Sequence, residues 1–231
     1  MAKKEEQEEK SAFESSEALA DQISKSEEFI EKNKNVITYA LFAVVGVVAA
    51  FFWLKMQKEE TESEAQAEMY NAQFYFEADS LNKALNGDGN HYGFIEIIEE
   101  YDGTKAANLA NFYAGVISLK NGQYDNAIDY LEEFSSSDLL IQARAYSLIG
   151  DANAENGNTV TAISFYKKAA NYKTNEQFTP IYLMKLAIAQ ESESDFAGAV
   201  ESYSKIINDF PNAQEVNDAK KRKARASGMA S

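Results

Sequence analysis

The chain has 231 residues, a formal net charge of −15, no cysteine and a single histidine, His91. The lack of cysteine excludes disulfides, thiolate metal sites and a thiol nucleophile, and one histidine alone cannot build a histidine-based metal site. The strong negative charge disfavours binding to nucleic acid phosphates, which proteins neutralise with basic side chains. We therefore expect no cofactor, no metal ion and no nucleic acid partner.

Residues 1–35 form an acidic and charge-rich segment. A helix is expected from Ser16, which can serve as its cap, with Leu19, Ile23 and Ile30 on one face. This face would lie along a bilayer or meet a cytosolic partner, whereas a simple solvated helix explains the pattern equally well.

The next segment, residues 36–54, runs from Val36 to Leu54 without a charged side chain. As a helix it would be about 28 Å long at about 1.5 Å per residue, close to the thickness of the hydrocarbon core of a bilayer. Tyr39 and Trp53 lie near its two ends, where aromatic rings prefer the membrane interface. We expect a transmembrane helix rather than the core helix of a soluble protein.

This apolar run is longer than the usual core of a signal peptide, and no small-x-small cleavage site follows it. It is therefore expected to be an uncleaved signal anchor. Lysines lie on both sides of the run, with a weak excess before it that places the N-terminus in the cytoplasm. The predicted protein crosses the membrane once, with its C-terminal domain on the outer face.

After Lys55 the chain is expected to stay helical as far as Gly87, and the transmembrane helix can continue into the soluble domain. One face of this helix would carry apolar side chains, namely Ala65, Met69, Ala72, Phe76 and Leu81. A loop at residues 86–90 separates it from a second helix, which ends near Gly103. Residues 71–103 are expected to form a degenerate first repeat, with Phe74, Ala78 and Ile97 in register.

A repeated pattern follows, in which Ala127, Ala162 and Ala199 occupy matching positions in three similar segments. Each alanine follows a small residue at the same interval of twelve residues, at Gly115, Gly150 and Ala187 respectively. This pattern resembles the tetratricopeptide repeat, a unit of two antiparallel helices. Tyr146 would take the large aromatic position of the second repeat and Pro211 the closing proline of the third. A generic helical bundle is the alternative.

The expected fold is thus all-α, with one N-terminal transmembrane helix followed by a short tetratricopeptide-repeat solenoid. Its segments are an acidic cytosolic tail (1–35), the anchor (36–54), a linking helix with the degenerate repeat (55–107), and three repeats with a C-terminal capping helix (108–231). The capping helix is placed at residues 213–226.

No phosphate-binding loop, nucleophile elbow or metal-ligand spacing is present, so we do not expect an enzyme. Repeat solenoids bind other proteins, and in the family that the repeats resemble the first helix of each unit forms the concave surface. The binding groove expected from this register has ten residues: Phe112, Val116, Leu119, Arg144, Ser147, Asp151, Glu155, Ile181, Met184 and Ile188. These apolar residues could instead pack against neighbouring repeats.

Some tetratricopeptide domains hold a terminal carboxylate with a clamp of Lys, Asn and Arg. The corresponding positions here carry Phe112, Val116, Leu148 and Ile181, and only Lys185 fits, so this mode is rejected. Within the anchor, Ala43, Gly46 and Ala50 form a strip of small residues that would let another membrane helix approach closely.

The order of tail, anchor and repeats, with Tyr101-Asp-Gly103 leading into an Ala-rich helix from Ala106, resembles the YfgM-type ancillary subunits of the bacterial Sec translocon. This resemblance implies association with a SecYEG-type channel and with a periplasmic membrane-anchored chaperone of the prolyl-isomerase type (PpiD-like). It also implies a role in passing exported, unfolded proteins onward. The same resemblance implies a single-pass protein of the bacterial inner membrane, with a cytoplasmic N-terminus and a periplasmic C-terminal domain. The alternative is a structural scaffold for cell-wall or outer-membrane assembly, because it needs the same anchor and binding solenoid.

Overall fold

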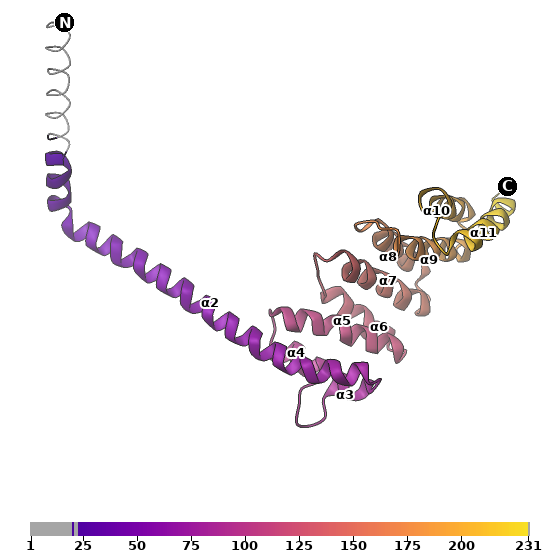
Figure 1. Ribbon diagram of the computed structural model, residues 1–231, viewed down its shortest axis with the longest axis horizontal. Helices are drawn as coiled ribbons and strands as arrows, with labels where there is room; N and C mark the ends of the chain where they lie inside the picture. Colours follow the sequence, from indigo (N-terminus) through magenta and orange to yellow (C-terminus); the bar gives the residue numbers. More distant parts are fainter. Residues whose placement is uncertain (1–19, 21–22, 231) are drawn as a thin grey trace, which may run out of the picture. The chain divides into compact units, whose positions relative to one another are not determined.

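The computed structural model describes residue 20 and residues 23–230, and all regular secondary structure in this part of the chain is helical (Figure 1). The expected all-α class is therefore confirmed. The chain forms two compact units, Met1–Glu59 and Glu60–Ser231. Ser16 and Leu19, which were expected to begin an N-terminal helix, lie outside the described residues.

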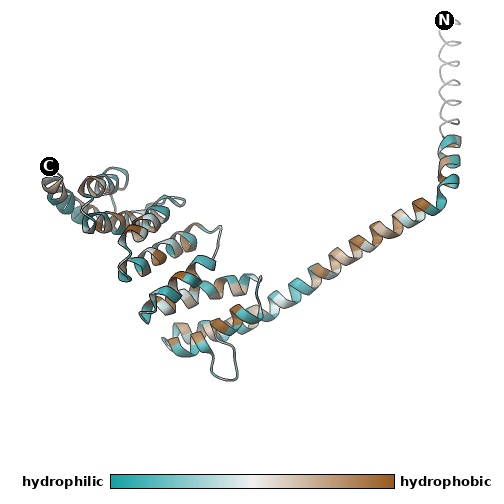
Figure 2. Ribbon diagram, turned by 180° about the vertical axis from the view of Figure 1, so that it is seen from behind, coloured by the Kyte–Doolittle hydropathy of each residue, from teal (hydrophilic) through white to brown (hydrophobic). Residues whose placement is uncertain are grey.

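The first unit contains a helix over residues 23–32, a turn at Asn33 and the beginning of α2 (Lys34–Glu77). From Val36 to Leu54 the apolar side chains of α2 are exposed. Figure 2 shows this part of the helix largely in the brown of hydrophobic residues. Thr38 donates its hydroxyl hydrogen bond to the carbonyl of Lys34 at 2.7 Å, so the helix satisfies this polar group internally. Within the described residues, α2 is the helix whose length and composition would allow it to cross a membrane.

The helix α2 continues past Lys55, as expected, but ends at Glu77 rather than near Gly87. Two short helices follow, α3 (Leu81–Asn86) and α4 (Phe94–Glu100). On the face of α2 that belongs to the second unit, Ala65, Met69 and Ala72 are buried against α4 and α5, in agreement with the predicted spacing.

Three helix pairs come next, and Figure 1 shows them as successive layers. They are α5 (Lys105–Lys120) with α6 (Tyr124–Glu133), α7 (Leu139–Glu155) with α8 (Thr159–Asn171), and α9 (Thr179–Ser192) with α10 (Phe196–Asp209). The final helix, α11 (Val216–Met229), packs on α10 and starts three residues later than the capping helix predicted at residue 213. Side chains of Thr104, Asp138 and Asp195 cap α5, α7 and α10 by accepting hydrogen bonds from backbone N–H groups.

The turn within each pair has the same hydrogen bonds. At Gly122, Gly157 and Ser194 the backbone φ is +72°, +80° and +61°, and each N–H donates to the carbonyl three residues earlier. The following N–H donates to the carbonyl five residues before it, which completes a Schellman motif. Glycine suits this left-handed conformation because it has no Cβ, and the third turn uses Ser194 instead.

The same turn also occurs between α2 and α3. Asp79 has a φ of +54°, its N–H donates to Phe76, and the N–H of Ser80 donates to Tyr75. This turn corrects the register of the first repeat. The small residues that match the later pairs are Ala72 and Ala84, which are both fully buried.

The residues proposed earlier, Phe74 and Ala78, do not belong to this helix contact. Phe74 is 58% exposed and Ala78 is also exposed, whereas Ile97 is buried but belongs to α4. The first repeat was misassigned because its second helix stops after six residues, at Asn86, and the loop that follows, together with α4, takes the place of the rest of that helix.

Small residues let the helices of each pair approach closely. Ala127, Ala162 and Ala199 are fully buried, as the repeat register predicted. A Cβ atom placed on Gly115 would lie 2.5 Å from Leu131, and one on Gly150 would lie 2.6 Å from the ring of Tyr166. A large side chain on the second helix therefore rests directly on a residue without a side chain on the first.

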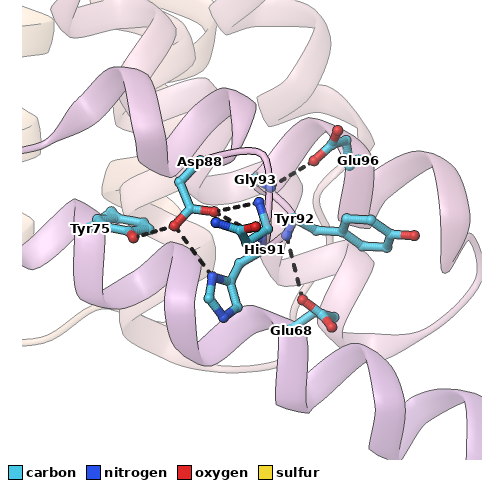
Figure 3. A network of polar contacts seen from close by, with 8 residues as sticks. Glu68, Tyr75, Asp88, His91, Tyr92, Gly93 and Glu96 are labelled. Carbon is cyan, nitrogen blue, oxygen red and sulfur yellow. Dashed lines mark hydrogen bonds and ion pairs between the residues drawn. The ribbon is translucent and has the colours of Figure 1, made fainter.

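A network of polar contacts joins the loop after α3 to α2 (Figure 3). Asp88 accepts hydrogen bonds from the Tyr75 hydroxyl at 2.6 Å and from the backbone N–H groups of Asn90 and His91 at 2.9 and 2.8 Å. The Tyr75 hydrogen bond, followed by these two backbone hydrogen bonds, holds the pKa of Asp88 well below its usual range. The single histidine of the chain, His91, belongs to this loop, and its Nδ1 lies 3.3 Å from a carboxylate oxygen of Asp88.

Candidate protein-binding groove

A groove opens across the first helices of three successive pairs, α5, α7 and α9. We call it the repeat groove, and its cavity has a volume of about 480 Å³. This volume lies within the range of about 300–1,000 Å³ that is typical of ligand pockets, so it suits a few side chains. The groove is lined by Phe112, Leu140, Ile141, Arg144, Ser147, Leu148, Phe178, Ile181, Tyr182 and Lys185.

Helix α7 supplies the middle of the repeat groove. Its start is fixed by Asp138, whose carboxylate accepts from the N–H groups of Leu140 at 2.8 Å and Ile141 at 3.1 Å. These two bonds are the largest causes of the lowered pKa of Asp138. Leu140 and Ile181 are well exposed, whereas Phe112 retains only 7% exposure and belongs to the core beneath.

The polar end of the repeat groove is organised around Lys185. Its ammonium group lies 2.6 and 2.8 Å from the two carboxylate oxygens of Asp151 and 3.2 Å from the hydroxyl of Ser147. Asp151 also accepts a hydrogen bond from the Tyr166 hydroxyl at 2.8 Å. Burial, and then the negative charge of Asp151, raise the pKa of Tyr166 far above its usual value, so this phenol stays neutral.

Tyr182 forms part of the wall between the apolar and polar ends. Burial raises the pKa of its phenol, while the positive charge of Arg144 acts in the opposite direction. The guanidinium of Arg144 is exposed, and it has no hydrogen bond or ion pair with any residue in the described part of the chain.

Four of the ten residues predicted for the groove line it: Phe112, Arg144, Ser147 and Ile181. Asp151 contributes through its ion pair with Lys185. The other five lie elsewhere. Val116 is buried together with Phe112, and Met184 packs against the buried residues that α8 to α11 share. Leu119 is half-buried on α5. Glu155 and Ile188 are exposed and lie outside the cavity.

The sequence analysis missed Tyr182 on α9, and it missed Leu140, Ile141 and Phe178, which lie at or just before the starts of α7 and α9. The sequence did contain a signal for the latter residues. Leu140 and Ile141 are apolar residues that closely follow the helix cap Asp138, and Phe178 is an apolar residue shortly before Pro180. The rejected carboxylate clamp also finds no support in the geometry, because Lys185 is already paired with Asp151.

The strip of small residues Ala43, Gly46 and Ala50, which was predicted to pack against another membrane helix, is exposed along α2, and a Cβ placed on Gly46 would meet nothing within 4 Å. In the part of the chain that the structure describes, no group of acidic, histidine or cysteine side chains is arranged to hold a metal ion.

Comparison with known proteins agrees with this architecture. Residues 182–213, which include most of α9 and all of α10, match the tetratricopeptide repeat family model. The chain contains a tetratricopeptide repeat. No curated protein sequence matches the chain.

Among solved structures, the crystal structure of MamA protein is similar with a TM-score of 0.53. The match covers 71% of this chain and 87% of that chain at 17% sequence identity, a level at which the likeness concerns the fold alone. The tetratricopeptide fold suggests a protein–protein interaction module, because such repeats present an extended surface for partners.

Proposed function

We propose that the chain is a membrane-anchored protein-interaction module that binds a partner protein in the repeat groove. The observation that carries this proposal is the groove itself, an apolar cavity across α5, α7 and α9 with well-exposed Leu140 and Ile181. Exposed apolar side chains in a concave site gain free energy when a partner covers them, at about 25 cal/mol per Å² of buried apolar surface. Binding, rather than catalysis, is the activity that this surface supports.

The anchor in this proposal is the segment Val36–Leu54 of α2. Its apolar side chains are exposed all round the helix, which would be costly in water and favourable in lipid. We assign the N-terminal side to the cytoplasm and the repeats to the periplasmic side of a bacterial inner membrane.

At the finer level, we propose an ancillary subunit of a SecYEG-type translocon that works with a PpiD-like membrane-anchored chaperone on exported proteins. This assignment rests on the resemblance to YfgM-type subunits. The anchor would supply part of the affinity for the channel through the small residues Ala43, Gly46 and Ala50, because small side chains allow close packing of membrane helices. The repeat groove would hold the chaperone or a client segment.

A pull-down in mild detergent tests both the role of the anchor in channel association and the role of the repeat groove in partner binding. Replacing Ala43, Gly46 and Ala50 by Leu should weaken recovery of Sec subunits, whereas Val44→Leu with Val47→Leu, which leaves the small strip intact, should not. In the groove, Leu140→Ala with Ile181→Ala should spare the channel and reduce recovery of a soluble-domain partner. The control is Val160→Ala, because Val160 is 71% exposed on α8 outside the groove.

One result would count against the translocon assignment: recovery of cell-wall or outer-membrane assembly factors without any Sec subunit, which is the outcome expected for a structural scaffold. Unchanged recovery of Sec subunits when the strip of small residues is filled would instead leave that assignment standing and contradict the role of the strip.

A further inference from the structure

The charges in the repeat groove are not balanced. Lys185 is neutralised by Asp151, with a shortest nitrogen–oxygen distance of 2.6 Å. Arg144 lies two turns before Asp151 on α7 and has no ion pair or hydrogen bond within residues 20 and 23–230. The groove therefore presents one uncompensated positive charge beside an apolar surface, in a chain whose net charge is −15.

A partner that covers the groove removes water from the Arg144 guanidinium and must replace the hydrogen bonds that the water made. An apolar segment would remove water from the guanidinium without replacing its hydrogen bonds, which is unfavourable. A carboxylate restores them, because guanidinium and carboxylate form two parallel hydrogen bonds. A basic segment would be repelled.

We infer that the repeat groove binds a short peptide segment that combines large apolar side chains with a side-chain carboxylate, and that this carboxylate pairs with Arg144. This inference rests on the proposed function and specifies the chemistry of its partner. Leu140 and Ile181 would contact the apolar side chains. We assign the carboxylate to an Asp or Glu side chain within the segment, because the clamp that holds terminal carboxylates in some tetratricopeptide domains also uses a Lys, and Lys185 is held by Asp151.

The test is a selection from a random peptide library displayed on phage with the peptide C-termini blocked, against the full-length chain in lipid nanodiscs. The native chain should enrich peptides that contain both large apolar residues and Asp or Glu. The Arg144→Glu variant should lose the acidic preference, and peptides selected on the native chain should bind it at least about tenfold more weakly.

Lys221→Glu is the matched control, since it changes the charge equally at an exposed position of α11. It should leave peptide affinity unchanged, and both variants should melt like the native chain. Three results would overturn the inference: no enriched peptide on the native chain, enrichment without an acidic preference, or an acidic preference that survives Arg144→Glu.

These outcomes are separable from those of the proposed function. Apolar peptides without acidic residues would leave the groove as a binding site and remove only the role of Arg144. If the pull-down recovers no Sec subunit but the peptide selection shows an acidic preference that depends on Arg144, this inference stands and the translocon assignment is contradicted.

Discussion

Gly150 shows how single small residues hold the repeats together. The ring of Tyr166 lies over it, and the Tyr166 hydroxyl is fixed by its hydrogen bond to Asp151. Because the ring is held at both ends, it cannot move aside for an added methyl group. The sequence identified this contact through the regular interval between Gly150 and Ala162, without showing which aromatic side chain fills it.

Replacing Gly150 with Ala should therefore destabilise the second pair. The added Cβ would lie 2.6 Å from the ring, and overpacking of this kind typically costs about 1–3 kcal/mol. Gly228→Ala is the control, because its Cβ would meet nothing within 4 Å and Ala favours a helix. Thermal unfolding of both variants measures the difference, and equal melting temperatures would show that the α7–α8 contact is looser than described.

Two buried serines should respond in opposite ways to the loss of their hydroxyl groups. Ser118 is 1% exposed, and its hydroxyl has no hydrogen-bond partner among the described residues. Ser202 is 5% exposed and donates to Gln190 at 2.7 Å. An unpaired buried hydroxyl costs about 1–3 kcal/mol, whereas a net hydrogen bond contributes about 0.5–1.5 kcal/mol.

We expect Ser118→Ala to raise the free energy of unfolding and Ser202→Ala to lower it. Chemical denaturation of the two variants and the native chain gives this comparison directly. A loss of stability in Ser118→Ala as large as that in Ser202→Ala would mean that the Ser118 hydroxyl is paired in solution.

At the scale of the elements, the sequence predicted the helices of the three later repeats well. Their turns carry glycine at Gly122 and Gly157, and their contacts carry small residues at a constant interval. The first repeat was predicted with the wrong register because its left-handed turn lies at Asp79 rather than at a glycine and its second helix ends after six residues. Ala72 and Ala84 carried the correct signal, but the loop at residues 87–93 and α4 broke the period that would have revealed it.

The repeat groove was predicted only in part for a related reason. The register identifies which helices face the groove, but the place where the cavity opens depends on how each helix starts. Leu140 and Phe178 enter the lining because α7 and α9 begin beside it, and Ile188 leaves it because α9 continues beyond the cavity. No periodic pattern encodes these positions.

The stabilising contribution of Asp88, in the loop after α3, should be lost in acid. The pKa of Asp88 is lower in the folded chain than the value of about 3.9 that is usual for an unfolded Asp. Its contribution to stability is therefore complete above about pH 4 and is lost as the pH falls below that value. Asp88→Asn removes this dependence.

We expect the native chain to melt at a higher temperature than Asp88→Asn at pH 7, with a difference that narrows as the pH falls below about 4. Tyr75→Phe is an independent check. It removes the largest cause of the shift, so NMR titration of the Asp88 carboxyl should show its pKa moving back up. A constant difference between the two chains down to pH 3 would contradict the role of this carboxylate.

For the whole molecule, the proposed topology places the two ends of the chain on opposite sides of a membrane. The basis is the weak excess of lysines before the apolar run, where Lys25, Lys32 and Lys34 precede it and Lys55 and Lys58 follow. Protease added outside spheroplasts should digest the repeats and spare residues 1–35. If the repeats survive until the membrane is lysed, the proposed orientation is wrong and the proposed periplasmic function is contradicted.

Binding of a partner protein in the repeat groove is the central claim, and site-specific photo-crosslinking in intact cells tests it most directly. A photo-reactive phenylalanine analogue would replace Ile181, which is 37% exposed in the groove, or Val160, which is 71% exposed on α8 outside it. We predict discrete protein adducts from position 181 that are absent at position 160 and that decrease in Arg144→Glu. Absence of adducts at position 181, or the same adducts from both positions, would contradict the account.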